Sequence, residues 1–137
     1  MRIAVIDGQG GGIGKAIIEK IKAQKNKDIS VLALGTNTMA TTNMLKAGAD
    51  EGATGENPIV YNSDKVDVIV GAVGIISPNS ILGELTPLMA KAIGESNALK
   101  ILIPYNKCNI YITGVVDESL QYHVDCAVKK ILSVCSK

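Results

Sequence analysis

Apolar residues over about the first 104 positions change repeatedly between strand-like runs and helical spacing. Residues 3–6 form a short apolar run without polar breaks, which is typical of a strand covered on both faces of a parallel sheet. Residues 14–24 change to a helical period. One stripe of that helix carries Ile13, Ile17, Ile18 and Ile21. The same alternation predicts further strands at residues 30–34, 52–54, 66–71 and 100–104.

Glycine and proline mark the expected boundaries of the next helices. A helix over residues 39–47 should end at Gly48, because glycine adopts the left-handed conformation that follows a helix at little cost. Asn57-Pro58 is typical of an N-cap and a first helical residue, since proline needs no amide hydrogen there. Thr86-Pro87 repeats this pattern and predicts a helix through about residue 93.

The C-terminal part adds one strand and a long helix. Polar and apolar residues alternate from Cys108 to Thr113, as in a half-exposed strand. Three residues separate this segment from the strand ending at Pro104, which is too short for a parallel crossover, so we expect an antiparallel strand at the sheet edge. The last helix has one apolar face, formed by Leu120, Val124, Ala127, Val128, Ile131, Leu132 and Cys135.

This order of elements predicts the fold class. Residues 1–137 should form a single Rossmann-like α/β domain, with a doubly wound, mostly parallel sheet and one antiparallel edge strand. Sheets of this kind bind ligands beyond the carboxyl ends of their strands, at the point where the strand order reverses. Loops that follow the predicted strands are therefore the place to search for a site.

Composition narrows the classes of function. Of 137 residues, 47% are hydrophobic, and 14 Lys and Arg balance 13 Asp and Glu, so no overall field attracts nucleic acid or an acidic membrane surface. The start of the chain lacks the apolar run of a signal peptide, and we expect a cytoplasmic protein. Three cysteines without a C-x-x-C pair predict neither a disulfide framework nor a zinc site, and we expect no bound metal.

The loop DGQGGGIG after the first strand is the most informative segment. Its residues are Asp7, Gly8, Gln9, Gly10, Gly11, Gly12, Ile13 and Gly14. Absence of side chains lets backbone amides and the following helix N-terminus converge on an anion, so the loop predicts binding of a phosphate or a similar group. A packing turn without a ligand is the alternative.

The spacing of Gly8, Gly12 and Gly14, followed by Lys15, resembles the cofactor loop of short-chain dehydrogenases over about residues 3–20. The resemblance implies that Gly8 makes the tight turn, Gly12 allows close approach of a pyrophosphate, and Gly14 packs the helix on the strand. Asp7 departs from that family, which usually has a small hydroxyl residue there. A carboxylate would repel a phosphate unless a proton or a metal intervened.

Other motifs fail at particular positions. Gln9 and Ala16 replace the first glycine and the hydroxyl residue of a Walker loop, so the sequence gives no support for nucleotide hydrolysis with magnesium. Asn109 replaces the aspartate that a guanine-reading N-K-x-D loop needs. Tyr61 and Lys65 have the spacing of the short-chain dehydrogenase catalytic pair, but they occur too early in the chain and on a different element.

Polar residues follow several of the predicted strands. Because these loops share one edge of the sheet, we include Thr36, Asn37, Thr54, Asn79, Ser80 and Asn106 in the candidate site. Ordinary turn chemistry is the alternative for each loop. Glu56 and Lys107 are the candidate charged groups and Cys108 is a candidate nucleophile, although a buried strand position is favoured for it. His123 is expected at an edge or on the surface of the last helix.

Five segments, DGQGGGIGKAI, LGTN, LKAGADEGATGEN, NSILGELTP and IPYNKCNI, make the whole chain resemble a family of small bacterial proteins of unknown function. Two functions remain open: a nucleotide-binding module without chemistry, and a small oligomeric enzyme acting on a nucleotide or phosphorylated metabolite at a site shared between subunits. Candidate cofactors are NAD, NADP or another nucleotide. Residues 35–37 carry no charge, so we expect less than about tenfold discrimination between NAD and NADP. We also expect a homo-oligomer, most simply a dimer.

Overall fold

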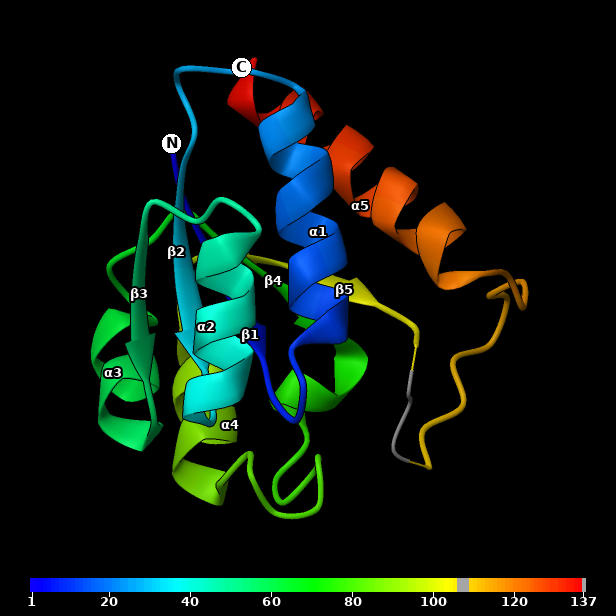
Figure 1. Cartoon of the computed structure of the whole chain (residues 1–137). Coiled ribbons are helices and arrows are strands. Elements are labelled where there is room, and N and C mark those ends of the chain that lie inside the picture. Colours follow the sequence, from blue (N-terminus) through cyan, green and yellow to red (C-terminus); the bar gives the residue numbers. More distant parts are fainter. Residues whose placement is uncertain (106–108, 137) are drawn as a thin grey trace.

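The computed structural model describes residues 1–105 and 109–136, and within these residues five strands form one parallel sheet (Figure 1). The strands are β1 (Arg2–Asp7), β2 (Ser30–Gly35), β3 (Glu51–Thr54), β4 (Val68–Ala72) and β5 (Leu99–Ile103). They lie in the order β3-β2-β1-β4-β5, and all four ladders are parallel. The doubly wound Rossmann-like arrangement predicted from the sequence is therefore confirmed.

Helices cover both faces of this sheet. The elements are α1 (Gly12–Ala23), α2 (Thr38–Lys46), α3 (Glu56–Asn62), η1 (Val73–Ile76), α4 (Pro87–Glu95) and α5 (Leu120–Cys135). Alternate side chains of β1 show how the faces divide: Ile3 and Val5 pack with α1, α2 and α5, whereas Ala4 and Ile6 pack with α3 and α4. Asp7 continues the first series, so its side chain points toward the beginning of α1.

Two of the predicted helix boundaries are confirmed and one is wrong. Gly48 has a φ of 118° directly after the C-cap of α2, as expected for a glycine that ends a helix. Thr86 caps α4, with Pro87 at its first turn. Asn57, predicted as the N-cap of α3, lies inside the helix, because Gly55 is the cap and Glu56 begins the helix. An Asn-Pro pair can thus occupy the first helical turn as well as the cap position.

The predicted antiparallel edge strand is wrong. Cys108 lies outside the described residues, and residues 109–113 make no ladder with any described strand. The chain moves away from the sheet after β5 and returns at α5, which packs on α1 and β5 (Figure 1). Alternation of polar and apolar residues can mark a strand only where a neighbouring strand supplies hydrogen bonds, and here Tyr111 is 81% exposed instead.

His123, expected at an edge or on the surface of the last helix, is not on the surface. Its residue is only 8% exposed, next to the fully buried Val124. The apolar stripe of α5 is therefore wider than the sequence spacing indicated. The Tyr122 ring meets the His123 ring edge-on, with centroids 5.5 Å apart.

Candidate functional site

The sheet reverses its strand order between β1 and β4. From β1 the chain builds outward through β2 and β3, and it then crosses to β4 on the other side of β1. A pocket of about 580 Å³ opens at this switch point, beyond the carboxyl ends of both strands. This volume falls in the range of small-molecule sites. Its lining residues are Asp7, Gly8, Gln9, Gly10, Gly11, Gly12, Ile13, Ala72, Gly74, Ile75, Ile81, Leu82 and Leu120.

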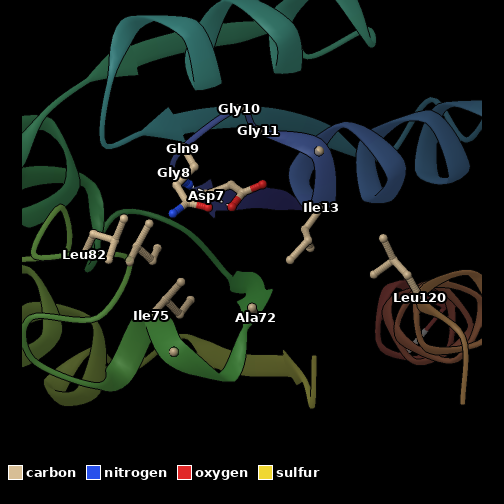
Figure 2. Close-up of a pocket in the computed structure, with 13 residues that line it drawn as sticks. Asp7, Gly8, Gln9, Gly10, Gly11, Ile13, Ala72, Ile75, Leu82 and Leu120 are labelled. Atoms are coloured by element: carbon tan, nitrogen blue, oxygen red, sulfur yellow. Dashed lines mark hydrogen bonds between the residues drawn. The ribbon is translucent and has the colours of Figure 1, made fainter. Parts of the chain in front are cut away.

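Two different surfaces face each other across this pocket (Figure 2). The loop of residues 7–13 supplies backbone groups on one side. Aliphatic side chains supply the rest: Ile13 from the end of this loop, and Ile75, Ile81 with Leu82, and Leu120 from three other parts of the chain. Asp7 is the one ionisable side chain among the described lining residues. The pocket therefore combines a polar backbone edge with an apolar wall.

Asp7 binds the beginning of α1 from within the sheet. Gly11, the N-cap residue of α1, has no side chain to accept an amide hydrogen. The carboxylate of Asp7 does so instead, accepting hydrogen bonds of 2.7 Å from the Gly14 amide and 2.7 Å from the Gly8 amide. Burial raises the pKa of Asp7, although hydrogen bonds from these two amides work in the opposite direction. Sequence analysis placed this carboxylate beside a phosphate. In the structure it already accepts hydrogen bonds from two amides of the loop.

Three glycines of the loop are required by packing. A methyl group on Gly8 would lie 2.9 Å from Oε1 of Glu84 and 3.1 Å from Cγ2 of Ile81. Gly11 has a φ of 74° and faces the backbone of Ala40, 2.9 Å from where its Cβ would be. Gly14 leaves no room for a Cβ against the Met44 side chain. These positions keep β1, α1 and α2 close together.

Gly10 and Gly12 are different from the other three. Both line the pocket and are exposed, their φ angles lie outside the left-handed region, and a Cβ on either would meet no atom within 4 Å. Their amides donate no hydrogen bond to any of the described residues. The fold therefore gives no reason for glycine at these two positions.

Glu84 is a charged residue of this region that sequence analysis missed. It lies between η1 and α4, yet its Oε1 accepts hydrogen bonds from the Gln9 amide (2.9 Å), Oγ1 of Thr36 (2.6 Å) and Nδ2 of Asn37 (2.8 Å). Partial burial opposes its charge, but these three bonds outweigh that effect and lower the pKa of Glu84. A carboxylate thus stands at the end of β2, where the sequence alone placed no charge.

Four other predicted site residues make hydrogen bonds near the pocket but do not line it. Asn37 also donates to the Gln9 carbonyl and caps α2 by accepting from the Ala40 amide. Thr54 bonds Thr41 between β3 and α2, and it does not line the pocket. Ser80 is buried and donates to the Gly74 carbonyl, and the Asn79 amide donates to the Leu85 carbonyl. These residues hold the loops around the pocket without lining it.

Several candidates lie elsewhere or outside the described residues. Asn106, Lys107 and Cys108 are not described, so their predicted roles stay predictions. Glu56 accepts a hydrogen bond from the Thr86 hydroxyl and does not line the pocket.

Tyr61 and Lys65 are also remote from the pocket. Nζ of Lys65 lies 3.9 Å from the centre of the Tyr61 ring, near the end of α3 and before β4. This pair therefore lies toward the opposite edge of the sheet from the pocket. In residues 1–105 and 109–136, no group of three or more His, Cys, Asp or Glu side chains could hold a metal ion. No helix of that part is long and apolar enough to cross a membrane.

Comparison with known proteins identifies the family of this chain. No curated protein matches the chain. One solved structure with a similar arrangement is a dodecameric FMN-dependent Ubix-like decarboxylase from Escherichia coli O157:H7, with 11% sequence identity and a TM-score of 0.47, over 100% of this chain and 95% of that chain. A protein family described as a domain of unknown function, DUF3842, matches residues 2–136. Because this match extends from β1 to the end of α5, the chain belongs to the DUF3842 family.

Proposed function

We propose that this domain binds a small anionic ligand, a phosphate ester or nucleotide, in the pocket at the switch point. The anion would accept hydrogen bonds from the amides of Gly10 and Gly12, at the beginning of α1. The observation that carries the proposal is that these two glycines are exposed in the pocket and are not needed by the fold. A ligand that approaches the backbone closely supplies the missing reason for glycine.

The position of the anion follows from the amides that are already occupied. Asp7 takes the amides of Gly8 and Gly14, and Glu84 takes that of Gln9. Gly10 and Gly12 are left facing the pocket, and the partial positive charge of the α1 N-terminus adds to their attraction for an anion. The carboxylate of Asp7 accepts hydrogen bonds from the amides of Gly8 and Gly14, and these two dipoles partly offset its repulsion of the ligand.

The aliphatic wall specifies the rest of the ligand. Ile75 is buried and Leu82 is 92% exposed, so the wall extends from the floor of the pocket to its rim. A flat ring joined to a phosphate would bury apolar area there while its phosphate reaches the loop. Nucleotides combine these two parts, and nucleobases or related rings fit this wall better than a bare phosphate ion does.

A binding module is favoured over an enzyme by the residues of the pocket. Acid and base catalysis generally needs two titratable groups near the reacting atoms, and Asp7 is the one ionisable side chain among the described lining residues. An enzyme would need groups from outside these residues, such as those of a second chain. We propose a homo-oligomer because several large apolar side chains are exposed, among them Leu82 and Tyr111.

Calorimetric titration tests the proposed ligand class. The panel contains inorganic phosphate, AMP, NMN, FMN and NAD, and the variant is Gly12→Val, at a pocket-lining position where an added Cβ would meet no protein atom within 4 Å. Gly94→Val is the matched control, because Gly94 is an exposed helical glycine of α4 with equally open space and does not line the pocket.

We expect at least one phosphate ester to bind the unmodified protein and the Gly94→Val control, and to lose most of its affinity for Gly12→Val. Circular dichroism melts establish that both variants fold. Undiminished binding by folded Gly12→Val would remove the loop from the site. Failure of every phosphate ester to bind the unmodified protein would refute the proposed function.

A further inference from the structure

The segment of residues 79–85, here called the strap, connects two parts of the ligand edge. It follows η1 and precedes α4, and it lies beyond the carboxyl ends of the strands (Figure 1). Ile81 and Leu82 of the strap line the pocket on the side of β4. Glu84, only two residues later, reaches across to the loops that follow β1 and β2. The strap therefore forms part of the pocket wall through Ile81 and Leu82, and its Glu84 covers the loops that follow β1 and β2.

Glu84 occupies the place that the second half of a dinucleotide needs. In dinucleotide-binding folds of this type, the pyrophosphate crosses the first glycine loop and a ribose lies at the end of β2. Here the polar side chains at the end of β2, Thr36 and Asn37, both donate to Oε1 of Glu84. The Gln9 amide donates to the same oxygen. Three donors that could recognise a ribose or a phosphate are thus committed to a carboxylate of the protein.

The path across the loop is closed as well. Gly8 is buried, and a single added carbon would lie 2.9 Å from Glu84 and 3.1 Å from Ile81. A pyrophosphate cannot pass over Gly8 while these two strap residues cover it. Gly10 and Gly12, which also line the pocket, are the glycines of this loop with open space around an added Cβ.

The strap is held in this position at several points. The Asn79 amide donates to the Leu85 carbonyl over 2.8 Å and closes the strap at its base. Ser80 is buried and bonds the Gly74 carbonyl, while Leu85 is fully buried. Displacing Glu84 would break three hydrogen bonds to a charged group, and such bonds are stronger than neutral ones.

We infer that the strap limits this site to ligands of mononucleotide size, because Glu84 and Ile81 close the route to the end of β2. This inference rests on the proposed function and narrows its ligand class. The anion and ring of a mononucleotide fit between the loop and the aliphatic wall, whereas the second nucleotide of NAD or FAD would have to displace the strap. Because Glu84 accepts a hydrogen bond from the Gln9 amide, its carboxylate would also repel a second phosphate placed over that part of the loop.

Matched ligand pairs test the inference. FMN and FAD share one ring and its first phosphate, as do NMN and NAD, so each pair differs only by the added nucleotide. In the unmodified protein we expect the mononucleotide of a binding pair to bind at least roughly tenfold more tightly. In Glu84→Ala this ratio should shrink, because the added nucleotide gains access to the donors at the end of β2 that Glu84 occupies in the unmodified protein.

Glu95→Ala is the control for loss of a carboxylate, because Glu95 lies on α4 and pairs with Lys91 at the surface. It should keep the ratio of the unmodified protein. Equal affinity for both members of a pair in the unmodified protein would overturn the inference and leave the proposed function standing. An unchanged ratio in folded Glu84→Ala would overturn the role of Glu84. If no mononucleotide or dinucleotide binds, the proposed function fails and the inference fails with it.

The ratio in the unmodified protein can be measured before any variant is made. A Glu84→Ala protein that does not fold would therefore leave that first comparison intact, and Glu84→Gln would then replace it. Glutamine keeps the length of the side chain but removes its charge, so the ratio should fall by less than with alanine. A ratio that rises in Glu84→Gln would contradict the role of the charge.

Discussion

Five glycines occur within seven positions after β1, and the structure divides them by what lies around each. Gly8, Gly11 and Gly14 are enclosed by neighbouring elements, whereas Gly10 and Gly12 face open space. The resemblance assigned Gly8 to the tight turn, Gly12 to close approach of a ligand and Gly14 to packing of the helix on the strand. In the structure a Cβ on Gly14 would lie 3.1 Å from Cβ of Asp7, at the end of that strand. The packing role of Gly11 could not be predicted, because it depends on the backbone of Ala40, which is distant in sequence.

Two substitutions in the same helix test this division. Gly14→Ala should lower the free energy of unfolding by about 1–3 kcal/mol, because its Cβ would collide with Met44 and lie 3.1 Å from Cβ of Asp7. Gly12→Ala should leave it unchanged or raise it by up to about 1 kcal/mol, since alanine is the better helix former. Urea unfolding of both variants measures these effects. Equal losses in the two variants would contradict the division.

Glu84 is a charge that sequence analysis did not place at the end of β2. The prediction of weak discrimination between NAD and NADP rested on residues 35–37, which carry no charge, and it stays a prediction. The fold brings a carboxylate there from a loop 47 positions later than Asn37. A reading of consecutive residues cannot detect such a contact, because the path of the strap is set by how η1 and α4 pack on the sheet.

At the scale of elements, β1, β2 and β4 were predictable because each is buried on two faces and leaves a continuous apolar run. The strand β3, at one edge of the sheet, is mostly exposed and leaves a much weaker pattern. Helix ends were predictable where the side chain itself makes the cap, as with Thr86, whose Oγ1 accepts from the Met89 amide. Two kinds of element were not. Residues 109–113 alternate like a strand without gaining a ladder partner, and the strap has no periodic pattern to recognise.

The strap should be sensitive to acid. Three hydrogen bonds lower the pKa of Glu84 below the usual 4.5 in the folded protein. The charged form of Glu84 therefore stabilises the folded state relative to the unfolded chain. This contribution to stability is complete above pH 4.5 and is lost as the pH falls through the pKa of the folded protein.

Urea unfolding of the unmodified protein and Glu84→Gln, each at neutral and acidic pH, measures the effect. The advantage of the unmodified protein at neutral pH should disappear on acidification. A difference between the two proteins that stays constant over this range would show that the charge of Glu84 does not stabilise the strap.

At the scale of the whole molecule, helices on both faces leave the carboxyl edge of the sheet as the open part of the fold (Figure 1). The fold class and the position of the pocket at the switch point followed from the order of elements, because connections of this kind leave few topologies. The apolar half of the pocket did not follow from the sequence. Its residues come from β1–α1, the region after β4, and the start of α5, and only the folded chain brings them together.

Self-association is the expected state of the molecule in solution. The described residues hold no antiparallel edge strand through which two sheets could pair, but Leu82, Tyr111, Val116 and Met39 are each more than 60% exposed. Large apolar side chains exposed in this way favour contacts between copies. Light scattering at micromolar concentration should give the mass of a dimer or a larger assembly. The mass of one chain would refute self-association and a site shared between subunits.

Native mass spectrometry of gently purified protein tests most directly whether the Gly10–Gly12 region holds a ligand. The account predicts that the unmodified protein carries, or takes up when offered, a phosphate-bearing molecule of mononucleotide size, and that folded Gly12→Val prepared in the same way does not. Retention of the same molecule by Gly12→Val would contradict the account. So would an unmodified protein that holds a ligand without an anionic group, or that binds none of the mononucleotides offered.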